Sequence, residues 1–260
     1  MHAPNEPIVR DLPAFAADVL ARVRARSPRV HCITNAVAQN FTANVLLAAG
    51  AIPSMTVAPD EIAAFTVGAD ALLVNLGTLD AGRREAADIA IEVAGEEGLP
   101  WVLDPVFVNR SEPRTAYARA LVARKPAAIR LNRAEFQAVA GSEPEGRALD
   151  AFALDCLSVI GLTGAVDVVT DGARRVTIEN GDPLMAKVTA MGCAGSAVLA
   201  ACLAIESDPW RATAAALLVL GVAGEIAAKV AKGPGSFAVA FIDAIAALDG
   251  AALADHARVR

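Results

Sequence analysis

Histidine, aromatic residues and paired cysteines are scarce in this chain of 260 residues. Three histidines and an aromatic fraction of 4% leave little material for a histidine-based metal site or catalytic triad. The four cysteines, Cys32, Cys156, Cys193 and Cys202, are scattered without a CxxC pair, which argues against disulfide staples and zinc sites. The strings GxxxxGK[ST] and GxSxG are absent, which excludes a P-loop and the usual hydrolase elbow.

Basic residues are also fewer than acidic ones. The chain has 23 basic and 29 acidic residues and a net charge of −6, which argues against nucleic-acid binding as its main function. A small anionic ligand stays compatible with this balance, because backbone dipoles bind anions whatever the net charge. The hydrophobic fraction of 55% excludes intrinsic disorder, whose compositional mark is low hydrophobicity.

The long uncharged runs do not resemble membrane spans. Residues 188–205 carry threonine, glycine and serine near their start, and residues 212–224 are too few to cross a bilayer. Buried helices of an α/β protein explain both runs better. No positively charged leader precedes an apolar, signal-like run. We therefore expect a cytoplasmic protein with no membrane partner.

Short apolar runs alternate with helical stretches along the chain, the pattern of a mostly parallel sheet with helices on its faces. We find no repeat and no long linker, and expect one domain over residues 1–260. Strands are expected at 29–34, 51–54, 71–75, 101–104 and 127–130, with a hairpin of 166–170 and 174–179 turned by Asp171-Gly172. Helices are expected at 35–49, from Pro59, at 82–94, from Arg133, and at 192–205, 209–232 and 237–248.

Polar residues stand at the ends of several expected strands. They are Thr34-Asn35, Ser54-Met55, Asn75, Asp104, residues 130–132 and Thr163-Gly164. Ligands of open α/β sheets bind outside the carboxyl ends of the strands. If the strands are parallel, these residues meet at one edge and form the candidate site.

The segment KVTAMGCAGS, residues 187–196, leads into a long apolar helix through small residues. The first turn of such a helix offers unpaired N–H groups and the positive end of the dipole, which cradle a phosphate or developing negative charge. The dipole could also lower the pKa of Cys193 and favour its thiolate. The alternative is a helix start with small residues for close packing and a buried, inert cysteine.

Three other positions each have a functional and a structural interpretation. Asp104 could bind Mg²⁺ or orient a substrate hydroxyl, or cap a loop. Asn132 and Glu135 have the spacing of a capping box, and the same spacing suits a metal–phosphate site. Met55 would ordinarily fill a gap in the core. The string at 233–238 fits G-x-G-x-x-G/A but follows a helix, so the dinucleotide interpretation fails.

Taken together, the ordered segments of this chain resemble the hydroxyethylthiazole kinase family of the ribokinase-like superfamily, from about residue 20 to 248. The matching segments are VHCITN (30–35), NFTAN (40–44), GAIPSM (50–55), NLGT (75–78), LDPV (103–106), AIR (128–130) with Asn132 and Glu135, LTG (162–164) with VD (166–167), NG (180–181), KVT (187–189), GC (192–193) and KGPGSF (232–237). The resemblance implies a three-layer α/β/α fold with a central, mostly parallel sheet. It also implies ATP-dependent phosphorylation of the hydroxyethyl group of 4-methyl-5-(2-hydroxyethyl)thiazole with Mg²⁺, by a homotrimer with sites at subunit interfaces.

The resemblance also implies roles for individual residues. Met55, Ala190 and Asn35 would bind the thiazole. Arg130, Thr163, Asn132, Thr189 and Gly192 would bind ATP, and Glu135 with Asp104 would bind Mg²⁺. Cys193 would be the catalytic residue, at the place where related sugar kinases carry an aspartate base. Its role could be that of a weak base, a positioning group or a tolerated substitute.

The chain departs from the family at this same site. The family's DPVGAGA loop is DPVFVNR at residues 104–110, a glycine is replaced by Leu131, and TGxGC is TAMGC at 189–193. A residue such as Ala190 would meet a requirement for positive φ uncomfortably. Three alternatives therefore stay open. They are a kinase for another small heterocyclic or sugar alcohol, a catalytically weakened ligand-binding homologue, and an ADP-dependent dehydratase.

Overall fold

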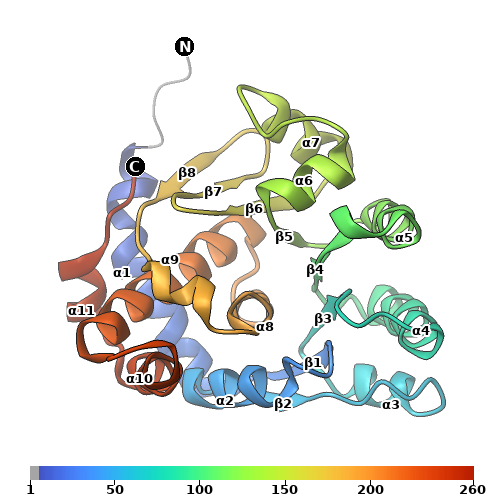
Figure 1. Cartoon of the computed structure of the whole chain (residues 1–260), viewed down its shortest axis with the longest axis horizontal. Coiled ribbons are helices and arrows are strands. Elements are labelled where there is room, and N and C mark those ends of the chain that lie inside the picture. Colours follow the sequence, from blue (N-terminus) through green and yellow to red (C-terminus); the bar gives the residue numbers. More distant parts are fainter. Residues whose placement is uncertain (1–5) are drawn as a thin grey trace.

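The protein is built on an eight-stranded sheet in the order β2-β1-β3-β4-β5-β6-β7-β8 (Figure 1). A computed structural model describes residues 6–260, so the first five residues of the expected domain lie outside the described part. The strands are β1 (Arg29–Ile33), β2 (Ile52–Ser54), β3 (Ala71–Asn75), β4 (Trp101–Asp104), β5 (Ala128–Asn132), β6 (Val159–Thr163), β7 (Asp167–Thr170) and β8 (Arg175–Ile178). Strands β1 to β6 pair in parallel, and β7 and β8 complete the sheet as antiparallel strands.

Helices cover both faces of the sheet, which confirms the expected three-layer α/β/α architecture (Figure 1). One layer is α1 (Glu6–Arg26), α2 (Gln39–Ala49), α8 (Met191–Leu203), α9 (Pro209–Val230), α10 (Pro234–Ala247) and α11 (Gly250–His256). The other is α3 (Ile62–Val67), α4 (Ala81–Glu97), α5 (Glu112–Val122), α6 (Arg133–Ala140) and α7 (Ala148–Cys156). Two short 3-10 turns, η1 (Val108–Arg110) and η2 (Pro183–Lys187), lie in the connections.

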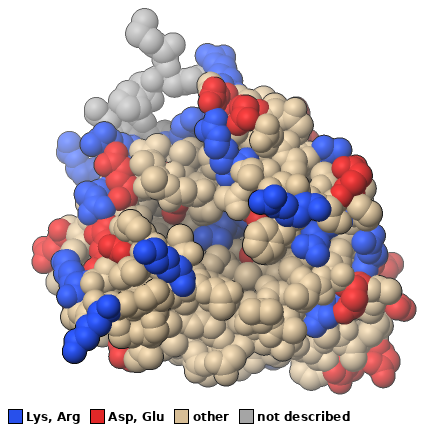
Figure 2. Space-filling model, in the orientation of Figure 1, with Lys and Arg blue, Asp and Glu red and all other residues tan. Residues whose placement is uncertain are grey.

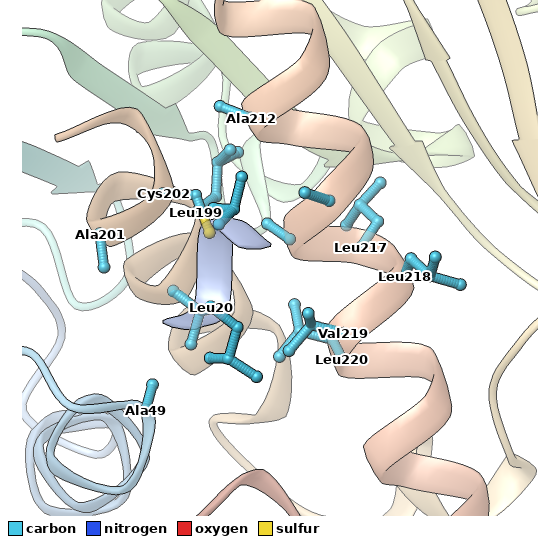
Figure 3. Packing of buried hydrophobic residues seen from close by; sticks show 14 of the residues in the cluster. Leu20, Ala49, Leu199, Ala201, Cys202, Ala212, Leu217, Leu218, Val219 and Leu220 are labelled. Carbon is cyan, nitrogen blue, oxygen red and sulfur yellow. The ribbon is translucent and has the colours of Figure 1, made fainter. Parts of the chain in front are cut away.

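The apolar, alanine-rich helices α8 and α9 lie in the middle of the first layer. Leu199 and Cys202 of α8 lie beside Leu20 of α1 (Figure 3), and Leu220 of α9 packs toward Gly195 of α8. The small alanine side chains let the helix backbones approach closely. Helix α9 extends beyond the uncharged run at both ends and is long and apolar enough to cross a membrane, yet 72% of its apolar window is buried inside the fold. Burial of this extent is what a core helix shows.

Most expected elements occur within a few residues of their expected bounds, with several differences. Helix α2 begins at Gln39 rather than at Asn35, because the Asn35 side chain accepts the N–H of Ala38 (3.0 Å) in a turn before the helix. The expected last helix, 237–248, is α10, and α11 lies beyond it as a separate helix capped by Asp249 through the N–H of Ala252 (2.8 Å). Helices α1, α5, α7 and α11 were not expected, and of β6 only its end at Thr163 was.

Candidate functional site

A cleft of about 790 Å³ opens at the carboxyl edge of the sheet. Its lining comes from the ends of β1, β3, β4, β5 and β6, from the loop after β4, and from residues 185–193. Figure 2 shows the face hollowed at its middle, with basic atoms inside the hollow. Arg130 and Lys187 are the basic residues of the lining. The parallel strands therefore bring their polar ends together, as the sequence predicts.

The cleft collects every residue to which the family resemblance assigns a role, except Met55. Those in its lining are Asn35, Asp104, Arg130, Asn132, Glu135, Thr163, Thr189, Ala190, Gly192 and Cys193. Met55 is half-buried and packs against the core cluster outside the cleft. Lys187, Phe107 and Thr78 also line the cleft, although the sequence assigned them no binding role. Each lies in a segment that the sequence singles out: Lys187 opens residues 187–196, Phe107 lies in the altered loop 104–110, and Thr78 ends the matching segment 75–78.

A chain of hydrogen bonds crosses the floor of the cleft. Ser196 Oγ and Asn75 Nδ2 both donate to Asp104 Oδ2, at 2.8 and 2.7 Å. Asn35 Nδ2 donates to Asn75 Oδ1 (3.1 Å) and to Cys193 Sγ (3.2 Å). All five side chains are buried. The thiol of Cys193 is thus connected to the carboxylate of Asp104 through two amides.

Burial controls the protonation of this chain of residues. It raises the pKa of Asp104, against the opposing charge of Arg130 and the hydrogen bonds from Ser196 and Asn75. Burial, joined by the charge of Asp104, raises the pKa of Cys193 to about 11. The expectation of a lowered pKa for Cys193 is therefore wrong, because burial is the largest cause of the shift and raises the pKa. Cys193 is a thiol at neutral pH.

Glu135 closes the capping box that the sequence predicts at the start of α6. Its Oε2 accepts the N–H of Asn132 (2.9 Å), while Asn132 Oδ1 accepts the N–H of Glu135 (3.0 Å). The second oxygen, Oε1, accepts the N–H of Phe107 (3.0 Å), which ties the loop after β4 to the helix. Burial and the nearby charge of Asp104 raise the pKa of Glu135. Glu135 thus both caps α6 and lines the cleft.

The donor set of the cleft fits Mg²⁺. Asp104 and Glu135 both line it and repel each other electrostatically, which a cation between or beside them would relieve. Mg²⁺ prefers oxygen ligands and is usually held by one or two carboxylates together with water and substrate phosphates. Within residues 6–260 no cluster of three or more His, Cys, Asp or Glu side chains could hold a metal by itself. A magnesium ion here would therefore share its ligands with a phosphorylated substrate.

Helix α8 presents its first turn to the cleft. Its N-cap, Ala190, makes no side-chain capping bond, and residues 189–193 all line the cleft. Arg130 Nη1 donates to the carbonyl of Gly192 (2.9 Å) and so lies along the helix start. Free backbone N–H groups at a helix N-terminus bind anions. The arrangement can therefore hold a phosphate.

Three residues of the cleft have a positive φ. They are Ala190 (70°), Phe107 (55°) and Thr78 (44°). Ala190 and Phe107 stand where the resembling family has glycine, so the sequence-based doubt about Ala190 identifies a real requirement for positive φ. Phe107 lies 62% exposed at the cleft. Leu131, the third departure, is buried in the core beside the cleft.

Comparison with known proteins decides the family. A sequence model described as "Hydroxyethylthiazole kinase family" matches residues 20–250. The chain belongs to the hydroxyethylthiazole kinase family. A probable hydroxyethylthiazole kinase of Agrobacterium fabrum is 46% identical over 246 residues, which cover 95% of either chain.

Solved structures agree with this family and with the fold. The structure of a hydroxyethylthiazole kinase protein from Pyrococcus horikoshii superimposes with a TM-score of 0.91 at 38% identity, and covers 95% of this chain and 98% of its own. A ribokinase-like superfamily protein from Enterococcus faecalis has a TM-score of 0.67 at 14% identity, over 88% of this chain and 93% of its own. The second likeness concerns the fold alone, which is the ribokinase-like α/β fold.

Proposed function

We propose that this member of the hydroxyethylthiazole kinase family transfers the γ-phosphoryl group of ATP to the hydroxyethyl group of 4-methyl-5-(2-hydroxyethyl)thiazole, in thiamine salvage in the cytoplasm. One domain carries the activity. The observation that supports the proposal best is the meeting of three features in one cleft. They are the open first turn of α8, the carboxylates of Asp104 and Glu135, and the Asn35–Cys193 pair.

The residues divide the cleft into two ends. Arg130, Thr163, Asn132, Thr189 and Gly192 bind ATP in this proposal, with Lys187 supplying a second positive charge. Asn35 and Ala190, together with Met55, bind the thiazole. Phosphoryl transfer depends on positioning and charge stabilisation more than on covalent help from the protein. The backbone N–H groups of α8 stabilise charge that develops on the transferred group.

Asp104 and Glu135 hold Mg²⁺, which neutralises phosphate charge when it is bound. Ser196 and Asn75 keep Asp104 oriented through their hydrogen bonds. Cys193 lies at the alcohol end, where its thiol is held by the amide of Asn35. Since the pKa of this thiol is raised to about 11, its contribution in the resting enzyme is to orient the alcohol.

We further propose that the active unit is a homotrimer with thiazole sites between subunits. Met55 lies outside the cleft of one chain, which agrees with a pocket completed by a second copy. The edge of the sheet near Met55 supports this arrangement, because Ile52 and Phe65 are exposed there beside a hollow of about 310 Å³.

A second candidate function follows from the loop after β4. The exposed ring of Phe107 takes up space at the cleft where the family has glycine, so a different small heterocyclic or sugar alcohol is the alternative acceptor. A coupled assay of ADP release with Mg²⁺, ATP and a panel of alcohols tests both. Turnover with the thiazole alcohol supports the first function, and turnover only with another alcohol supports the second. Nucleotide binding without turnover on the whole panel would indicate a ligand-binding homologue and contradict both.

A further inference from the structure

The wall of the cleft formed by residues 185–189 belongs to no strand and to no long helix. It follows β8 through the turn Asn180-Gly181 and the short turn η2, and ends at the start of α8. Asp182 stabilises η2 internally by accepting the N–H of Leu184 (2.8 Å). Contacts with other parts of the chain must therefore fix the position of this wall relative to the sheet.

Helix α9 provides two of these contacts through glycine. A Cβ at Gly221 would lie 2.7 Å from the Cβ of Asn180, and one at Gly224 would lie 2.5 Å from the sulfur of Met185. Both distances are shorter than real Cβ contacts allow. The bare helix backbone is thus what lets Asn180 and Met185 seat against α9.

The C-terminal tail, residues 257–260, supplies the remaining contacts. It runs beside β8 (Figure 1), where Val259 forms a bridge with Ile178 and the N–H of Glu179 donates to the carbonyl of Arg258 (2.8 Å). The buried Asn180 donates to the carbonyl of His256 (2.8 Å) and accepts the N–H of Arg258 (2.7 Å). The end of α11 and the tail therefore hold the nitrogen and the oxygen of the Asn180 side-chain amide, in the turn that leads to the wall.

One ion pair completes the arrangement. Arg258 Nη1 donates to Glu225 Oε2 (3.0 Å), and Glu225 Oε1 accepts from the N–H of Gly181 (2.9 Å) and from Asn180 Nδ2 (3.1 Å). Burial opposes ionisation, but the hydrogen bonds from Arg258, Gly181 and Asn180 hold the pKa of Glu225 below its ordinary value. The carboxylate of Glu225 thus joins the tail, α9 and the turn that carries the wall.

We propose that the C-terminal tail is a clasp that positions the nucleotide side of the cleft, with Arg258 and Glu225 as positioning residues that touch no substrate themselves. The assignment of residues 185–189 to the nucleotide side rests on the proposed function. The placement of these residues by the clasp does not. Arg258 is therefore expected to affect nucleotide binding from a distance, through Gly181 and Met185.

The test compares Arg258→Ala with Arg260→Ala, a matched variant of the same tail. Arg260 pairs with Glu179 at 3.2 Å and its side chain is 78% exposed, and unlike Arg258 it does not pair with Glu225. We expect Arg258→Ala to raise the calorimetric Kd for ATP about tenfold, since hydrogen bonds to charged groups have this order of strength. The KM for ATP rises with it, the KM for the alcohol stays unchanged, and Arg258→Lys restores part of the loss. Arg260→Ala leaves all of these at the wild-type values.

Hydrogen exchange separates this proposal from the proposed function. The backbone amides of residues 184–189 should exchange faster in Arg258→Ala than in the wild type and in Arg260→Ala, whatever substrate the enzyme uses. A wild-type protein that binds no ATP would contradict the proposed function, and the exchange rates would then decide on the clasp. Unchanged exchange in both Arg258→Ala and the isosteric Glu225→Gln, or a KM that rises equally for ATP and the alcohol, would overturn the clasp.

Discussion

Left-handed backbone at Ala190 and Phe107 places conformational strain inside the cleft itself. Residues other than glycine disfavour this region because Cβ crowds the following carbonyl, at a cost of roughly 1–2 kcal/mol each. Ala190 is the N-cap of α8, and Phe107 is tied to Glu135 through its N–H. The surrounding contacts therefore hold both residues in conformations that glycine would adopt freely.

Replacing Ala190 by glycine is expected to stabilise the protein. Ala190→Gly removes the Cβ at φ 70°, so the free energy of unfolding should rise by about 1 kcal/mol, less the entropy that glycine gains in the unfolded chain. Urea unfolding monitored by circular dichroism measures it. Ala194→Gly, within α8, is the control and should destabilise by about 1 kcal/mol. Equal destabilisation by both variants would show that Ala190 carries no strain.

The role of Cys193 can be resolved with a single-atom change. A thiol whose pKa is raised to about 11 orients the alcohol rather than removing its proton, so Cys193→Ser should retain a rate within about tenfold of the wild type, at unchanged affinity for the alcohol. A general base typically contributes about 10² to 10⁴ in rate. Steady-state kinetics at saturating ATP measure the change. A loss of that size at unchanged affinity would instead make Cys193 the base.

At the scale of the elements, His31 joins two strands around Met55. Its Nε2 lies 3.2 Å from the carbonyl of Thr56, which can only accept, so Nε2 carries the proton. Nδ1 then accepts from the hydroxyl of Ser54 (2.8 Å). The ring packs at 5.7 Å from that of Phe65. Both neighbours of Met55 along the chain are therefore fixed by one neutral imidazole.

This arrangement predicts a dependence of stability on pH. Burial lowers the pKa of His31 from 6.5 to about 4. Between these values the unfolded chain binds a proton that the folded protein does not, so stability is lost as the pH falls. The loss from His31 amounts to at most about 3 kcal/mol, at about 1.4 kcal/mol per pKa unit.

The measurement is the free energy of unfolding of the wild type and of His31→Gln at several values between pH 7 and pH 4. The variant loses the two hydrogen bonds but also the unfavourable protonation. The stability difference between the two proteins should therefore shrink as the pH falls through this window. A difference that stays constant from pH 7 to pH 4 would contradict the assignment.

The sequence predicts the strands and the edge at which they end better than the helices. Asn75 and Asp104 could be found because each follows a fully apolar run, and parallel order then places them together. Helix α1 was not predicted because it contains Pro13, α5 because charged residues interrupt its apolar ones, and α7 because it has only nine residues. The pKa of Cys193 could not be predicted, since it depends on burial by segments far apart in the chain. The contacts between the C-terminal tail and Asn180 could not be predicted for the same reason.

At the scale of the whole molecule, one edge of the sheet is left open. Strand β2 lies at the end of the strand order, and no strand within residues 6–260 lies beside its backbone groups on that side. Ile52 and Phe65, 50% and 42% exposed, line a hollow at this edge with Ser54, next to Met55. Exposed apolar edges are normally covered in native proteins. A second copy of the chain, as the proposed trimer requires, would cover this one.

Ile52→Glu should therefore dissociate the trimer, because a carboxylate placed in an apolar contact between subunits would be desolvated at a cost of several kcal/mol. Sedimentation velocity should show a monomer, and the KM for the thiazole alcohol should rise at least roughly tenfold, because Met55 no longer meets its partner. The Kd for ATP should stay unchanged, since the nucleotide residues lie within one chain.

Leu157→Glu, at an exposed leucine beyond α7, is the control and should leave the assembly intact. An Ile52→Glu protein that sediments as the wild type does would place the interface elsewhere. Loss of ATP binding together with the trimer would mean that the nucleotide end of the cleft also depends on a second subunit.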